Sequence, residues 1–170
     1  PLQVGPLLKL VVMYNSYFRL YRYWKSREAF SNQGNSLFWP KPEDSYARVY
    51  FTCYTDGSRI NNETGYGYAI NRFKRTIYEG KEYIGPNASV FQAEVAAIKE
   101  VCFVLRRRIG QTILIRSDSQ SAIQAINATN MTSKTVCDCI TALNELGSRN
   151  TVTLSWIKAH NNHPGNELAD

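Results

Sequence analysis

The hydrophobic pattern of the chain changes its period near residue 88, and this change constrains the fold more than any other feature. Before it, residues 48–55, 65–72 and 76–83 are rich in β-branched and aromatic side chains, which predicts three β-strands. The links between these segments are too short to hold crossover helices. The three strands are therefore expected to form an antiparallel meander.

After this point the apolar residues recur at helical spacing. Residues 90–108 place them on one face, and Ser89 with Gln92 predicts a capping box at the helix start. Further elements are predicted as a strand at 112–116, helices at 121–126 and 133–146, and a strand at 151–157. The resulting order βββαβααβ predicts an α/β fold, a five-stranded mixed sheet with helices on both faces.

Residues 1–46 differ from the rest, because Tyr, Phe and Trp alternate there with Arg and Lys. Apolar and aromatic side chains at helical spacing predict a helix over residues 6–26, and the polar stretch 31–44 predicts a linker. We therefore divide the chain into an N-terminal aromatic and basic helical extension, 1–46, and a domain, 47–170. Such a helix suits docking on another domain better than stacking on nucleic acid, although both interpretations remain open.

Composition limits the function classes without choosing among them. The chain has 44% hydrophobic residues, enough for a packed core, and a formal net charge of +6, which is compatible with a polyanionic partner. The basic run Arg106–Arg108 fits either a helix C-terminal cap or a phosphate contact. Four cysteines without metal-site spacing predict buried free thiols in a reducing compartment. The absence of a signal peptide or membrane-spanning segment predicts an intracellular domain without a membrane partner.

Four carboxylates stand at positions that matter in this fold: Asp56, Glu94, Asp118 and Asp170. Each has an ordinary interpretation when taken alone. Asp56 precedes Gly57 after a predicted strand, as in a hairpin turn. Glu94 lies in the first turns of a helix, where it complements the helix dipole, and Asp118 precedes a short helix that it could cap. Asp170 closes the sequence.

Taken together, these acids point to a metal site. Adjacent central strands would bring Asp56 and Asp118 side by side, and crowded carboxylates repel one another unless cations bind between them. Ligand sets made only of oxygen atoms suit Mg²⁺ or Mn²⁺. Two such ions form a common arrangement for in-line displacement at phosphorus, where one activates water and the other stabilises the leaving oxygen.

Four segments, in this order, resemble the motifs of type-1 ribonucleases H over residues 47–170. They are Tyr-Thr-Asp-Gly-Ser (54–58), Gln-Ala-Glu (92–94), Ser-Asp-Ser-Gln (117–120) and the run from Trp156 to Asp170. The resemblance implies the ribonuclease H-like fold and an endonuclease that hydrolyses the RNA strand of RNA–DNA hybrids. It also implies two Mg²⁺ ions, for which Mn²⁺ substitutes.

The resemblance also implies residue roles. Asp56, Glu94, Asp118 and Asp170 match the metal-binding catalytic carboxylates. His160 matches a loop histidine that assists proton transfer or product release, work for which a pKa near neutrality is suited. Contacts to the nucleic-acid backbone or sugar are expected from a further set: Gly57, Ser58, Gln120 and Asn166.

The amino-acid sequence at 91–94 and 117–122 is most similar to the corresponding motifs of domains that follow the reverse transcriptase in non-LTR retrotransposon polyproteins. A reverse transcriptase of the same polyprotein is then a possible partner, and 1–46 would pack on its side. The family continues past the fourth acid into a helix, which is expected to be truncated here. The alternative function is therefore a catalytically weak or inactive remnant that only binds nucleic acid or a partner. A transposase or integrase fits the motifs less well.

Overall fold

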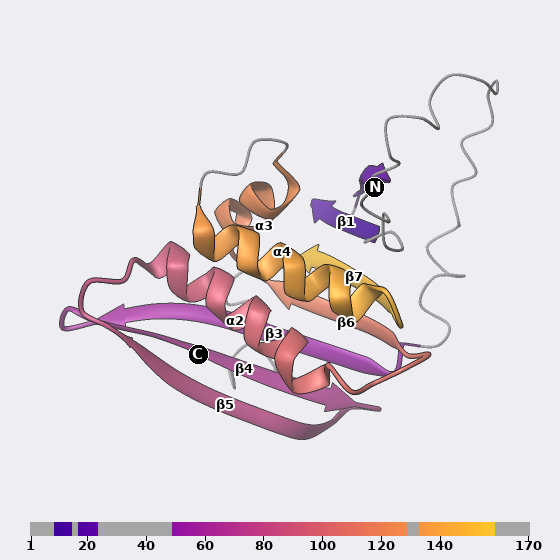
Figure 1. The fold of residues 1–170 in the computed structure, drawn as a ribbon, viewed down its shortest axis with the longest axis horizontal. Coiled ribbons are helices and arrows are strands. Elements are labelled where there is room, and N and C mark those ends of the chain that lie inside the picture. The colour runs from indigo at the N-terminus through magenta and orange to yellow at the C-terminus, as the bar shows by residue number, and fades with distance from the viewer. Residues whose placement is uncertain (1–8, 15–16, 24–48, 129–132, 159–170) are drawn as a thin grey trace, which may run out of the picture.

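A mixed β-sheet forms the centre of the protein (Figure 1). The computed structural model describes residues 9–14, 17–23, 49–128 and 133–158. The strands after residue 48 are β3 (Phe51–Ile60), β4 (Glu63–Arg72), β5 (Arg75–Gly85), β6 (Thr112–Ser117) and β7 (Thr151–Trp156). They lie in the order β7-β6-β3-β4-β5, with β3, β6 and β7 parallel and β3, β4 and β5 antiparallel. The α/β class and the predicted five-stranded mixed sheet are confirmed, and two further strands at 9–14 and 17–23 extend the sheet to seven.

The meander is closed by two tight turns. Asn61 and Asn62 join β3 to β4 with φ angles of 50° and 67°, and Phe73 with Lys74 joins β4 to β5 with 49° and 66°. Two successive left-handed residues make the turn type whose twist matches that of paired strands, and Asn adopts this conformation readily. Strand β3 therefore continues past its predicted end, through Asp56 and Gly57, to Ile60. The hairpin-turn interpretation of Asp56-Gly57 is wrong, because the Asn pair makes the turn instead.

Three helices follow the meander: α2 (Val90–Leu105), α3 (Gln120–Asn127) and α4 (Lys134–Gly147). The predicted capping box is confirmed, since the Gln92 backbone N–H donates to Ser89 Oγ at 3.2 Å and the Ser89 N–H donates to Gln92 Oε1 at 2.8 Å. Helix α2 ends at Leu105, before the predicted 108. The Arg106 guanidinium donates to the Phe103 carbonyl at 2.7 Å, as the cap interpretation expects.

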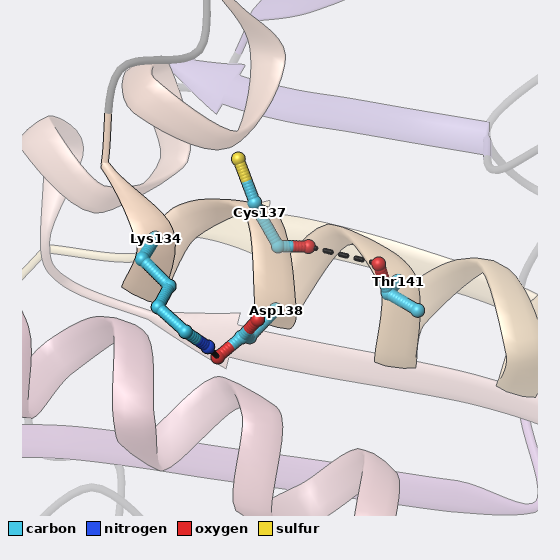
Figure 2. Close-up of polar contacts among 4 residues, drawn as sticks. All are labelled: Lys134, Cys137, Asp138 and Thr141. Atoms are coloured by element: carbon cyan, nitrogen blue, oxygen red, sulfur yellow. Dashed lines mark hydrogen bonds and ion pairs between the residues drawn. The ribbon is translucent and has the colours of Figure 1, made fainter.

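Helix α4 is held at its exposed side by contacts one turn apart. Its N-cap residue, Ser133, makes no side-chain capping bond. Figure 2 shows instead an ion pair of 2.8 Å between Lys134 and Asp138, and a hydrogen bond of 3.0 Å from the Thr141 hydroxyl to the Cys137 carbonyl. Such i,i+4 pairs contribute only a few tenths of a kcal/mol each, ~0.2–0.5, so packing is the main support of this helix.

All three helices share one hydrophobic core with a single face of the sheet. The core joins every second residue of the central strands to the apolar faces of the helices. Its fully buried members include Cys53, Ile70, Val95, Ile98, Val101, Leu105, Ile113, Ile115, Leu143 and Leu154. The predicted placement of helices on both faces is not found in the part of the chain that the structure describes, because the apolar sides of α2, α3 and α4 all join the core on one face of the sheet. The opposite face carries the even-numbered residues of β3 and β6.

The N-terminal residues form strands where a helix was predicted. Strands β1 (Lys9–Tyr14) and β2 (Tyr17–Tyr23) pair antiparallel, and β1 lies parallel to β7, with Lys9 opposite Thr153. The helix predicted over 6–26 is therefore wrong. Tyr, Phe and Val favour strands, and β7 offers an unpaired edge on which a strand can form. The linker 31–44 lies outside the described residues, and the division at 46/47 stays a prediction.

Two expectations from composition can be compared with the structure. All four cysteines are free, and three of them, Cys53, Cys102 and Cys139, are buried, as predicted. Burial raises the pKa of the Cys139 thiol to about 12, so this thiol is protonated and unreactive at neutral pH. No helix among the described residues is long and apolar enough to span a membrane.

Candidate active site

Two parallel strands bring the first two carboxylates together. Strands β3 and β6 pair in register up to Thr55 and Ser117. Asp56 is the next residue within β3, and Asp118 is the first residue after β6, so the two acids lie side by side where the pairing of these parallel strands ends, as the sequence predicted. Both are half-buried, and both make further interactions with their surroundings.

Helix α2 brings the third carboxylate, and Gly57 makes its approach possible. The missing side chain at Gly57 leaves room that the helix itself fills. A Cβ atom there would lie 2.7 Å from the Glu94 backbone nitrogen, 3.0 Å from Ala93 Cβ and 3.0 Å from Glu94 Cγ. From the sequence, Gly57 was expected to contact the nucleic-acid backbone or sugar. The structure assigns this room to α2, whose first turns rest against β3 so closely that only glycine fits.

Glu94 is 6% exposed, and its acidity is strongly perturbed. Burial, reinforced by the nearby Asp118 and Asp56 carboxylates, raises the pKa of Glu94 to about 8, although a backbone hydrogen bond from Gly57 opposes part of the shift. Its Oε2 atom is buried without a hydrogen-bond partner among the described residues. A buried carboxylate oxygen without a donor is costly, so this side chain is not a simple partner of the helix dipole.

The three side chains fit a divalent cation. One carboxylate oxygen from each of Asp56, Glu94 and Asp118 lies within 4.8 Å of the other two. An oxygen-only set is typical of Mg²⁺ and Mn²⁺ sites, and a bound cation would supply the unpaired Glu94 oxygen with the positive charge that the protein does not. These residues are therefore the ones that would hold a metal ion.

Asp118 is positioned by its neighbours and does not cap α3. The N-cap of this helix is Ser119, whose hydroxyl accepts a bond of 3.3 Å from the Ala122 N–H. The Trp156 indole N–H donates to the Asp118 carbonyl at 2.8 Å, and the Ile157 N–H donates to the Ser117 carbonyl at 3.0 Å. Strand β7 thus holds the β6–α3 connection from one side, which fixes the position of Asp118 beside the other acids.

Trp156→Phe is expected to weaken divalent-cation binding by roughly 10- to 100-fold, the usual cost of losing a group that orients a metal ligand. Phenylalanine keeps a ring at this position but removes the N–H that holds the Asp118 carbonyl. Titration of the metal-free protein with Mn²⁺, followed calorimetrically, measures the change. Tyr50→Phe, an exposed aromatic change at the far end of β3, serves as the control. Equal Mn²⁺ affinity in wild type and Trp156→Phe would show that the indole is not needed for positioning.

The remaining predicted site residues divide into two groups. Ser58 is half-exposed on β3, two residues after Asp56 and on the same side of the strand, and Gln120 is exposed at the first position of α3. Their contacts to nucleic acid stay predictions. His160, Asn166 and Asp170 lie outside the described residues.

Two features near the acids were not singled out from the sequence. Trp156 belongs to the quoted motif, but its bond to the Asp118 carbonyl depends on tertiary structure. The second feature is Arg116, which pairs with Tyr54 across β6 and β3 on the face that carries Asp56. The alternation within β3 places Tyr54 on the side of Asp56, but the register that sets Arg116 opposite Tyr54 comes from the sheet.

Comparison with known proteins agrees with this geometry. The structure is similar to RNase H1 from the halophilic archaeon Halobacterium salinarum NRC-1, at 20% identity and a TM-score of 0.57, covering 70% of this chain and 93% of that one. It is similar to the N-terminal RNase H domain of rv2228c from Mycobacterium tuberculosis, solved as a fusion with maltose binding protein, at 17% identity, a TM-score of 0.58, and 71% and 91% coverage.

A third similar structure is LC11-RNase H1 in complex with an RNA/DNA hybrid, at 19% identity, a TM-score of 0.51, and 70% and 93% coverage. At these identities the likeness shows the fold. Comparison with curated protein sequences gives no significant match. The family model described as RNase H matches residues 48–170, which include strands β3 to β7, the three helices and all four acidic positions. Since that match covers most of its length, the chain belongs to the RNase H family of ribonucleases.

Proposed function

We propose that this protein is an endonuclease that hydrolyses the RNA strand of RNA–DNA hybrids with the help of two divalent cations, Mg²⁺ or in its place Mn²⁺. One observation carries the proposal. Carboxylate oxygens of Asp56, Glu94 and Asp118 lie within 4.8 Å of one another in a chain of the RNase H family, and the buried Glu94 keeps one oxygen that no described residue donates to. Such a cluster is unstable without cations and suits phosphodiester hydrolysis when they are bound.

In this proposal the carboxylates bind the cations and His160 transfers a proton. Asp56, Glu94, Asp118 and, in this proposal, Asp170 bind the cations and fix their positions relative to the scissile phosphate. When bound, such a pair of ions activates a water molecule and neutralises the charge that develops on the leaving oxygen. His160 is proposed to move a proton during attack or product release.

To distinguish an RNA–DNA hybrid from a DNA duplex, the protein must contact the 2′-hydroxyl groups of the RNA strand. Ser58 and Gln120 border the acids and offer small polar groups for such contacts, and Asn166 and the Gly57 backbone are proposed to join them. A solved similar protein, LC11-RNase H1, was crystallised with an RNA/DNA hybrid, which supports this substrate class.

The wider context is also proposed. The amino-acid sequence of residues 91–94 and 117–122 supports an origin in a non-LTR retrotransposon polyprotein, in which a reverse transcriptase domain would be the partner. Residues 1–46 would then form the connection toward that domain. A cleavage rate that rises when the isolated reverse transcriptase is added would support this, and an unchanged rate with no measurable complex would contradict it.

Asp118→Asn is expected to reduce cleavage of hybrid RNA by at least about a hundredfold, because bound cations contribute several kcal/mol to stabilisation of the transition state. Labelled RNA–DNA hybrid, RNA duplex and DNA duplex are incubated with protein in Mg²⁺, in Mn²⁺ or in chelator. Metal-dependent cutting of hybrid RNA alone is the expected result. Asp138→Asn, an exposed Asp on α4, is the matched control and should cut normally. Hybrid binding without cutting in either metal would contradict the proposal.

A further inference from the structure

Arg116, on strand β6, lies on the face of the sheet that carries Asp56. Arg116 stands two residues before Asp118, and its register partner Tyr54 stands two residues before Asp56. Residues separated by two positions point to the same side of a strand and lie roughly 7 Å apart. Tyr54 and its cross-strand partner Arg116 therefore share the face of the sheet that carries Asp56, where no described helix packs, and a carboxylate oxygen of Asp118 lies within 4.8 Å of one of Asp56.

The guanidinium is held in place by Tyr54. Arg116 Nη1 donates to the Tyr54 hydroxyl at 3.2 Å, and the Arg116 Cζ atom lies 5.7 Å from the centre of the Tyr54 ring. Tyr54 is itself only 8% exposed and packs with Ile157. The rotamer of this arginine is therefore restricted before any ligand arrives, which lowers the entropic cost of binding one.

The charge of Arg116 has no counter-ion within residues 49–128 and 133–158, since no acidic side chain there forms an ion pair with it. Its Nε atom is buried without a hydrogen-bond partner in the same region. An arginine has five N–H donors in a planar fork, and Tyr54 uses one of them. A half-buried, immobilised guanidinium with unused donors matches the geometry of a phosphate group, which accepts two parallel bonds from such a fork.

Resting on the proposed function, we propose that Arg116, held by Tyr54, binds a backbone phosphate of the nucleic-acid substrate next to the phosphate that is cleaved. In this proposal the acids hold the cations at the scissile phosphate. Arg116 lies opposite Tyr54, two residues before Asp56 along the sheet. A contact at this distance fixes the path of the strand across the acids and carries no base specificity. Arg116 is thus a substrate-positioning residue.

Three substitutions test the contact. Arg116→Gln removes the charge, and is expected to weaken binding of a hybrid by roughly tenfold, the usual size for a lost charged hydrogen bond. It should also lower the slope of log Kd against log salt by about 1, because one fewer counterion is released. Arg116→Lys keeps the charge, so the salt slope should stay while the affinity falls. Tyr54→Phe keeps the ring but removes the acceptor, and should weaken binding less than Arg116→Gln.

The measurements use a 5′-labelled RNA–DNA hybrid with Mg²⁺ on an Asp118→Asn background for Kd, and the otherwise unchanged protein for kcat and KM. Arg75→Gln removes an exposed arginine at the β4–β5 turn, at the end of the sheet where β3 begins, and should change neither Kd nor the salt slope by as much. The melting temperature of each variant shows whether it folds. If Arg116→Gln fails to fold, Arg116→Lys and Tyr54→Phe decide the question.

An Arg116→Gln protein that folds and keeps the wild-type KM and salt slope would overturn the phosphate contact while leaving the proposed nuclease intact. So would a loss of stability with unchanged binding, because it would make Arg116 a structural residue. Failure of the unsubstituted protein to bind or cut any hybrid would instead refute the proposed function itself.

Discussion

Glu94→Gln is expected to abolish cleavage and, at the same time, to stabilise the metal-free protein at pH 8 and above. In the folded protein the pKa of Glu94 is raised to about 8 from 4.5, because the carboxyl is buried beside Asp118 and Asp56. Between these two pH values the folded state binds more protons than the unfolded state. The contribution of Glu94 to the free energy of unfolding is therefore highest below pH 4.5. It falls as pH rises from 4.5 to about 8 and stays low above that.

Glutamine has nearly the shape of the protonated acid but never becomes charged, so this loss of stability disappears in the variant. The gain above pH 8 should be about 1–3 kcal/mol, the cost of a buried charged group without a partner. Excess Mg²⁺ should reverse the order of stability, since the cation binds the folded wild type and pairs with its carboxylates. Activity should fall at least about a hundredfold, because one ligand loses its charge.

Melting temperatures measured from pH 4.5 to 9 in chelator, for wild type and Glu94→Gln, give the comparison. Glu145→Gln, an exposed change on α4, is the control and should follow the wild type at every pH. Parallel curves for wild type and Glu94→Gln would contradict the raised pKa. An active Glu94→Gln protein would remove Glu94 from the metal site.

Gly57→Ala is the second change with a large expected effect. The new Cβ would lie 2.7 Å from a backbone nitrogen of α2, closer than real Cβ atoms approach, and a backbone atom cannot swing aside. The start of α2 must therefore move away from β3 and carry Glu94 away from Asp56 and Asp118. Strain of this kind in a packed core typically costs about 1–3 kcal/mol. Cation affinity and activity should fall together with the melting temperature.

Gly147→Ala makes the matched control for this substitution. A Cβ at Gly147 meets nothing within 4 Å, and the residue ends helix α4, so alanine there should be neutral or slightly stabilising. Mn²⁺ binding by calorimetry, thermal unfolding and hybrid cleavage are measured for both variants. Normal Mn²⁺ affinity in Gly57→Ala would show that β3 and α2 can separate without disturbing the acids.

The sequence by itself determined the order of elements after residue 48 and the place of two acids. Period-two and period-3.6 patterns are local, because each reports which side of one strand or helix is buried. They located β3 to β7 and α2 to α4 and predicted that Asp56 and Asp118 lie side by side. The same local signals were wrong at 6–26, where pairing with the edge of β7 outweighs helical spacing.

Tertiary structure alone decided how the acids are controlled. The role of Gly57 depends on what packs against it, and the pKa of Glu94 depends on burial and on the charges of Asp118 and Asp56. The bond from Trp156 to Asp118 joins residues 38 positions apart, and the pairing of Arg116 with Tyr54 spans 62. Electric fields and steric contacts act through space, so no local pattern records them. The residue types marked the site, and the packing around them set its chemistry.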